Sequence, residues 1–150
     1  KRHSINRHWF LRLNFRYSVY DQAPASMIEW SIAMTPKEVV EIWIERFNNA
    51  DATGLAELYH LDATNHQVTQ EPIRGRENIR AMFEQEFTNA EMVCIPEEIH
   101  EAGEVIALEW RDPRGLRGCG FFTIRSEEIC FQRGYWDKLS FLKMHGLPIE

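Results

Sequence analysis

ICFQRGYWDKLSFLKMHGLP, residues 129–148, has the pattern of a β-strand that continues into a short helix. The strand, Ile129–Tyr135, is rich in aromatic and branched side chains, which suit the wall of a pocket. Asp137 stands where strand and helix meet, directly after Tyr135 and Trp136. A carboxylate beside aromatic side chains is a candidate for proton transfer, so Asp137 is the first candidate catalytic residue.

The length and composition of the chain are those of one ordinary globular domain. The chain has 150 residues, 44% hydrophobic and 27% charged, which is enough to bury a core. No run of 18 apolar residues and no secretory signal is present, so we expect no membrane partner and a cytoplasmic location. The net charge of −6 argues against nucleic acid as a partner. The three cysteines form no C-x-x-C pair, and we expect them to be reduced.

Residues 1–33 differ from the remainder. Residues 1–20 hold five basic side chains and no acidic one, with aromatic residues between them. We expect an accessory segment that packs on the domain or on a partner chain, and whose removal leaves a folded domain. The alternatives are a nucleic-acid arm, a pre-sequence or translated upstream sequence, because Met27 and Met34 are both possible starts. The domain itself is predicted over residues 34–150.

Four helices are predicted. Thr35, Pro36 and Glu38 form a capping box with proline at the first helical position, which marks the start of a helix. Apolar residues at helical spacing follow, and Gly146 is typical of the end of the last helix. The predicted helices span residues 35–49, 52–59, 76–89 and 138–145.

The strands follow each other closely. Short turns between successive strands indicate antiparallel hairpins. Helices and strands that are segregated along the chain indicate an α+β fold. We therefore predict three N-terminal helices packed in the concave face of a strongly curved, mostly antiparallel sheet, with a short C-terminal helix. The predicted strands span residues 64–68, 92–101, 104–112, 116–125 and 129–135.

Three stretches carry a family resemblance: FNNAD…LYHLDAT (residues 47–64), IRGRENI (73–79) and YWDKLSFLKMHGL (135–147). In this order they resemble the SnoaL-like and ketosteroid-isomerase-like superfamily, also called the nuclear-transport-factor-2-like cone fold. The resemblance covers about residues 35–150. It implies a cone-shaped α+β barrel, an apolar cavity and a homodimer. It does not imply one activity, because this fold hosts several enzyme classes and pure binding proteins.

The resemblance is carried over residue by residue. The oxyanion tyrosine of the ketosteroid isomerases falls on Trp43, and their general-base aspartate on Gln67. Limonene-epoxide-hydrolase-like enzymes use an arginine between two aspartates. The arginine position falls on Trp110, one aspartate on Asp112 and the other on Gly134.

The pair that holds water in those epoxide hydrolases falls on Asn65 and Gln67. SnoaL-like polyketide cyclases use an acidic residue and a neighbouring histidine inside the cone. Asp137, Asp112 and His66 are the groups in this sequence that fit such a description, so the cyclase branch is the least contradicted.

Each acid also has a structural explanation. Strand alternation puts Asp112 on the same apolar face as Trp110, which points it into the cone, but Asp112-Pro113-Arg114-Gly115 is also a turn signal. Asp137 would equally cap the helix that begins after it. His66 lies on the opposite strand face from Asn65 and Gln67, so only one of these sets lines the cavity.

We therefore predict a cofactor-free, metal-free enzyme that performs acid–base chemistry on a small apolar polyketide-, steroid- or epoxide-like molecule. The alternative is a ligand-binding or dimerising module without catalysis. A homodimer is expected through the outer sheet face, which carries Val105 and Ala107. The predicted catalytic residues are Asp137, Asp112 and His66, and the predicted substrate-binding residues are Trp43, Asn65, Gln67, Trp110, Tyr135 and Trp136.

Overall fold

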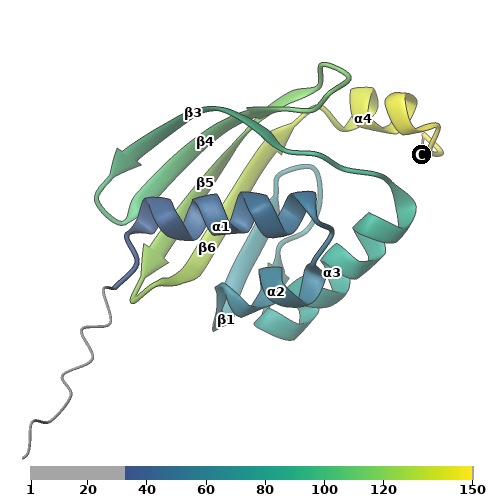
Figure 1. The fold of residues 1–150 in the computed structure, drawn as a ribbon. Coiled ribbons are helices and arrows are strands. Elements are labelled where there is room, and N and C mark those ends of the chain that lie inside the picture. Colours follow the sequence, from purple (N-terminus) through teal and green to yellow (C-terminus); the bar gives the residue numbers. More distant parts are fainter. Residues whose placement is uncertain (1–32, 150) are drawn as a thin grey trace, which may run out of the picture. The chain divides into compact units, whose positions relative to one another are not determined.

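The computed structural model describes residues 33–149 as a curved six-stranded sheet with helices packed against one of its faces (Figure 1). The predicted accessory segment, residues 1–33, lies outside the described residues except for Ala33. The described elements are, in chain order, α1 (Pro36–Asn48), α2 (Ala52–Glu57), β1 (Tyr59–Gln67), β2 (Ile73–Arg74), α3 (Arg76–Asn89), β3 (Ile95–Ala102), β4 (Val105–Arg111), β5 (Arg117–Arg125), β6 (Glu128–Trp136) and α4 (Lys138–His145).

The sheet is mixed, with the strand order β2-β1-β6-β5-β4-β3. The strands β3 to β6 form the predicted antiparallel meander, and β1 joins its β6 edge in parallel. The α+β class, the three helices before the meander and the short helix after it are as predicted. None of the helices within residues 33–149 is long and apolar enough to cross a membrane.

Helix α1 begins where the capping box predicts. The Thr35 hydroxyl accepts a hydrogen bond from the Glu38 amide (3.2 Å), and the Glu38 carboxylate accepts one from the Thr35 amide (2.7 Å). These reciprocal bonds satisfy amides that have no partner inside the helix. The helix then buries Val39, Val40 and Trp43 against the sheet.

Strand β1 is longer than the sequence indicates. The predicted helix over residues 52–59 ends at Glu57, and the chain is already extended at Tyr59 rather than at Thr64. The cause is long-range pairing, because the Ile129 amide donates to the Leu58 carbonyl (2.8 Å). The pairing shifts its register between Tyr59 and Thr64, which bulges the strand.

Pairing register decides which side chains face the helices. Side chains on directly paired residues point to the same face of a sheet. One row across β4, β5 and β6 is therefore inner and the next is outer. The inner rows are Ile106–Phe122–Gln132, Leu108–Gly120–Gly134 and Trp110–Gly118–Trp136; the outer rows include Ala107–Phe121–Arg133 and Glu109–Cys119–Tyr135.

An aromatic cluster fills the space between the helices and the inner face. Trp43 stacks on Phe47 with ring centroids 5.0 Å apart, and it meets Phe122 edge to face at 5.2 Å. Phe83 and Phe87 of α3 stack at 5.8 Å. Such contacts add to the hydrophobic gain from burial, so the cluster holds α1 and α3 on the sheet.

A chain of hydrogen bonds runs through this core. The Trp43 indole N–H donates to the Tyr59 hydroxyl (2.9 Å), which donates to the Gln132 side-chain carbonyl. The Asn65 amide donates to the same carbonyl (3.0 Å), and the Gln67 amide donates to the Asn65 carbonyl (2.8 Å). Finally, the Trp136 indole N–H donates to the Gln67 carbonyl (3.0 Å), so the chain connects α1, β1 and β6.

Removing the Tyr59 hydroxyl should break this chain at its centre. In Tyr59→Phe, the Trp43 N–H loses its acceptor and the Gln132 carbonyl loses a donor, both in the core. We expect a loss of about 1–3 kcal/mol in the free energy of unfolding, measured by urea denaturation.

Tyr135→Phe is the matched control for that substitution. Tyr135 is 43% exposed, and its hydroxyl has no hydrogen-bond partner among the described residues. Its removal should change the free energy of unfolding by less than about 0.5 kcal/mol. Equal losses in the two variants would mean that the buried hydrogen bonds add nothing to stability.

Candidate functional site

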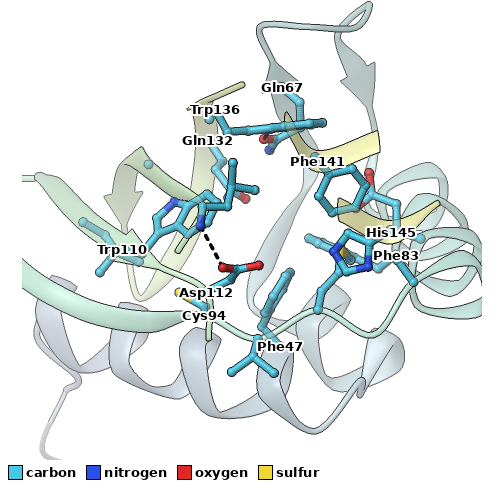
Figure 2. A pocket seen from close by; sticks show the side chains of 18 of the residues that line it. Phe47, Gln67, Phe83, Cys94, Trp110, Asp112, Gln132, Trp136, Phe141 and His145 are labelled. Atoms are coloured by element: carbon cyan, nitrogen blue, oxygen red, sulfur yellow. Dashed lines mark hydrogen bonds between the residues drawn. The ribbon is translucent and has the colours of Figure 1, made fainter. Parts of the chain in front are cut away.

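A pocket of about 240 Å³ opens between the inner sheet face and the helices α1, α3 and α4. Figure 2 shows the aromatic side chains that surround the open space and the Asp112 carboxylate that points into it. Polar groups are few, and they come from separate elements. The aromatic lining residues drawn there with labels are Phe47, Phe83, Trp110, Trp136 and Phe141.

Glycines make the floor of the pocket possible. A Cβ atom at Gly134 would lie 2.0 Å from the Gln67 side-chain oxygen, and one at Gly118 would lie 2.4 Å from the Trp110 ring. Real Cβ atoms do not approach other atoms so closely, so the missing side chain at each glycine leaves room for the neighbouring inner side chain. The Gln67 side chain therefore packs against the backbone of β6 at Gly134, and its carbonyl accepts a hydrogen bond from the Trp136 indole.

Asp112 follows β4 and is only 7% exposed. Its Oδ1 accepts hydrogen bonds from the Arg114 and Leu116 amides, both at 2.8 Å. This is the turn that the sequence suggests as an alternative, yet the same residue lines the pocket. Oδ1 thus stabilises the turn, while Oδ2 accepts no hydrogen bond from the described residues.

Glu86 is the second acid in the pocket, and the sequence analysis missed it. It lies on α3, one turn after Phe83, and it lines the pocket. Burial raises the pKa of its carboxyl to about 7. No hydrogen bond or ion pair joins the Glu86 carboxyl group to another described residue. The described residues therefore do not offset the free-energy cost of ionising this carboxyl group.

Asp137 lies outside the pocket. It is exposed and caps α4, because its carboxylate accepts hydrogen bonds from the Leu139 amide (3.0 Å) and the Ser140 hydroxyl (2.5 Å). The bonds from Ser140, chiefly from its hydroxyl, hold the pKa of Asp137 below its ordinary value. Its geometry is that of the capping alternative, and it does not have the buried environment expected of a proton donor near neutrality.

Two further predicted residues lie away from the pocket. His66 pairs with Arg133 in an outer row of the sheet, on the opposite face from Asn65 and Gln67. Tyr135 also lies in an outer row, where its ring meets Phe121 at 6.0 Å. The expectation that Tyr135 forms a pocket wall is corrected here: adjacent strand residues face opposite ways, so Trp136 points inward and Tyr135 outward.

The remaining predicted binding residues lie at or under the pocket. Trp43, Gln67, Trp110 and Trp136 line it, whereas Asn65 is buried beneath and does not. The indole N–H of Trp43 and the side-chain amide of Gln67 already serve the core hydrogen bonds.

Gln132 is a polar lining residue that the sequence analysis did not select. Its side-chain carbonyl accepts hydrogen bonds from Tyr59 and Asn65, while its Nε2 donates to no described residue. Gln132 lines the pocket. Strand alternation from Trp136 back to Gln132 would have placed it on the inner face. Similarly, helical spacing from Phe83 would have placed Glu86 in the apolar stripe of α3.

Helix α4 closes one side of the pocket. Phe141 meets Trp136 edge to face at 5.3 Å, and His145 lies 4.5 Å from Phe141. The Arg114 guanidinium donates to the Met144 carbonyl (2.8 Å), which ties the helix to the turn after β4. His145, in the last turn of this helix, also lines the pocket.

Residues 33–149 contain no group of three or more His, Cys, Asp or Glu side chains placed to hold a metal ion. The three cysteines are free thiols. Burial raises the pKa of Cys94, which lines the pocket, to about 12, so its thiol remains protonated at neutral pH. The candidate groups for proton transfer in the pocket are therefore Asp112, Glu86 and His145.

Glu86→Gln should change how stability depends on pH. The folded state holds the Glu86 proton more tightly than the unfolded chain, so Glu86 lowers wild-type stability as pH rises from about 4.5 to about 7. At pH 4, below both pKa values, the two proteins should be about equally stable. At pH 8 we expect the variant to be more stable by about 1–3 kcal/mol, measured by denaturation at both values.

Glu84→Gln is the control, because Glu84 lies on the same helix but is exposed and paired with Arg80. It should show no gain at pH 8. Parallel pH profiles for wild type and Glu86→Gln would contradict the raised pKa.

The comparisons with known proteins agree with this fold. A family model described as a SnoaL-like domain matches residues 40–131. No curated protein matches the chain. Many solved structures have the same fold, and three of them illustrate its range.

SalBIII, an epoxide hydrolase/cyclase-like enzyme in pyran ring formation of the polyether salinomycin, is 21% identical with a TM-score of 0.62, over 69% of this chain and 92% of that one. A protein of ketosteroid isomerase-like fold from Catenulispora acidiphila, solved with trimethylamine, is 21% identical with a TM-score of 0.68, over 76% and 96%. TerC, co-crystallised with polyporic acid, is 16% identical with a TM-score of 0.65, over 75% and 99%.

At these identities the structural matches show the fold and leave the activity of this chain open. The family model matches more than half of the sequence, and its residues 40–131 run from α1 into β6. The chain therefore belongs to the SnoaL-like domain family.

Proposed function

We propose that the protein is an enzyme that performs cofactor-free acid–base chemistry on a small, largely apolar molecule bound in the pocket. The observation that carries the proposal is that two acids without an ion-pair partner among the described residues, Asp112 and Glu86, line a pocket formed mainly by apolar side chains, several of them aromatic. Pockets of this kind bind apolar ligands and orient them with a few polar groups.

Asp112 is the proposed proton acceptor. Its Oδ1 is held by two backbone amides, which fixes the carboxylate, and its Oδ2 is left for a ligand. A positioned base needs this combination of one anchored and one free oxygen, because proton transfer requires a defined geometry.

Glu86 is the proposed proton donor. Its pKa of about 7 leaves a substantial protonated fraction at neutral pH. Two carboxyl groups in different environments then take different roles, as in other enzymes that use paired acids. Gln132 supplies a free N–H donor for a substrate oxygen, because its carbonyl is already engaged in the core.

Polyketide-, steroid- and epoxide-like molecules are the proposed substrates, since each combines an apolar body with an oxygen that a carboxyl group can protonate. Proteins of the same fold support a small-molecule role. SalBIII is described as an epoxide hydrolase/cyclase-like enzyme, and two others were crystallised with trimethylamine and polyporic acid.

A binding module without catalysis is the second candidate. One observation favours it: the N–H of Trp43 and the amide of Gln67, which the resemblance matches to catalytic groups of ketosteroid isomerases, both form hydrogen bonds inside the protein. Such a module would bind the same ligands without converting them.

Asp112→Asn separates the two candidates. Asparagine keeps the Oδ1 acceptor and therefore the turn, but it cannot take a proton. With a panel of epoxides and polyketide-like ketones followed by mass spectrometry, we expect turnover by the wild type and a loss of about 100-fold or more in the variant.

Asp137→Asn is the matched control, because asparagine caps helices as well as aspartate does. It should retain full activity. Full activity in Asp112→Asn would remove Asp112 from the mechanism, and binding without turnover of any panel member would favour the binding module.

We also propose a homodimer through the outer sheet face. In Figure 1 helices α1 to α3 lie on the other face of the sheet. The outer face exposes Val105, Phe121 and Tyr135, and a second copy of the chain would cover these apolar side chains.

Phe121→Glu should disrupt that dimer by placing a charge in its interface. We expect a dimer for the wild type and a monomer with an unchanged circular dichroism spectrum for the variant, in sedimentation velocity. Leu61→Glu, at another exposed apolar side chain, should remain dimeric. A monomeric wild type would contradict the proposal.

A further inference from the structure

The charged side chains that line the pocket are almost all acidic. Glu86 comes from α3 and Asp112 from the turn after β4, while His145 is the single titratable base and comes from α4. No lysine or arginine is among the described residues that line the pocket. Arg114, two residues after Asp112, directs its guanidinium to the Met144 carbonyl.

Asp112 is more than nine-tenths buried, and its unpartnered Oδ2 points into the pocket (Figure 2). A buried carboxylate normally has a cation or enough hydrogen bonds to compensate for lost hydration. Here the described residues supply two hydrogen bonds to one oxygen and no cation to either. Among residues 33–149, the geometry is therefore that of a carboxylate without a positive partner.

The surrounding rings favour the same kind of partner. The faces of aromatic rings carry partial negative charge and attract ammonium groups. Trp110, Trp136 and Phe141 lie around the space that Asp112 points into (Figure 2). The indole N–H of Trp136 is held by Gln67, which fixes the orientation of that ring.

We propose that the pocket recognises an apolar molecule that carries a cationic nitrogen, with the ammonium group held between Asp112, Glu86 and the faces of these rings. This inference rests on the proposed function, because it takes the pocket as the ligand site. It adds one feature to the proposed substrate class, an amine or quaternary ammonium group on the apolar molecule.

The pH dependence of binding has a definite sign. A cation pairs with the ionised form of Glu86, and burial gives this carboxyl a pKa of about 7. Affinity for a permanently charged cation should therefore rise with pH between 6 and 8. The other titratable groups at the pocket are Asp112, His145 and Cys94, and burial raises the pKa of the Cys94 thiol and keeps it neutral. Tyr59 of β1 lies in the core beneath, and its raised pKa keeps it neutral as well.

The test compares two probes of one shape. Phenyltrimethylammonium and tert-butylbenzene differ only in the atom that carries the three methyl groups, nitrogen in one and carbon in the other. Binding to the full chain would be measured by NMR titration at pH 6 and pH 8. At pH 8 we expect the cation to bind at least about tenfold more tightly than the hydrocarbon.

Two variants locate the cation. Glu86→Gln and Asp112→Asn should each weaken binding of phenyltrimethylammonium at pH 8 by about tenfold and leave tert-butylbenzene within about twofold. The rise in cation affinity from pH 6 to pH 8 should shrink in Glu86→Gln. Asp137→Asn, outside the pocket, should match the wild type with both probes.

The outcomes distinguish this inference from the proposed function. Equal or tighter binding of tert-butylbenzene would overturn the cation preference and leave an apolar ligand pocket in place. Binding of neither probe would contradict both proposals. A cation preference that survives both pocket variants would overturn the assignment to Asp112 and Glu86.

Discussion

The structure depends on a constraint of low-dielectric interiors: polar groups that are buried must find partners there. In this core the partners form one chain of hydrogen bonds, which reaches from helix α1 through β1 to the end of β6. It holds β1 beside β6 and α1 on the sheet, and it fixes the amides that form the floor of the pocket. Its members are Trp43, Tyr59, Gln132, Asn65, Gln67 and Trp136.

The same constraint decides which groups remain for a ligand. Polar groups of the floor are used in the core, so they give shape and rigidity to the pocket. The groups with free hydrogen-bonding capacity stand around its rim and walls, on elements that meet only in the fold. Asp112 and Glu86 are among them, and both line the same pocket. The site therefore differs from the arrangements that the resemblance implied at Trp43 and Gln67.

Much of the fold was predictable because its signals are local. The capping box at Thr35 and the short turns between strands depend on a few neighbouring residues. They correctly predicted the start of α1 and the antiparallel meander of β3 to β6. Strand alternation also put Trp110 and Asp112 on the inner face. The same alternation puts Trp136 and Tyr135 on opposite faces. The sequence therefore already contained the signal against Tyr135 as a pocket wall.

The sequence by itself determined the α+β class, the helices and the antiparallel hairpins, because caps, turns and periodicity are properties of neighbouring residues. Only the tertiary structure decided the parallel pairing of β1 with β6, which joins segments about seventy residues apart and begins the strand at Tyr59. It also decided the environment of the acids. Glu86 and Asp137 are the same kind of group in sequence, but burial raises the pKa of one and hydrogen bonds at a helix end lower the pKa of the other. Desolvation depends on every element around a carboxyl group, and no local pattern records it.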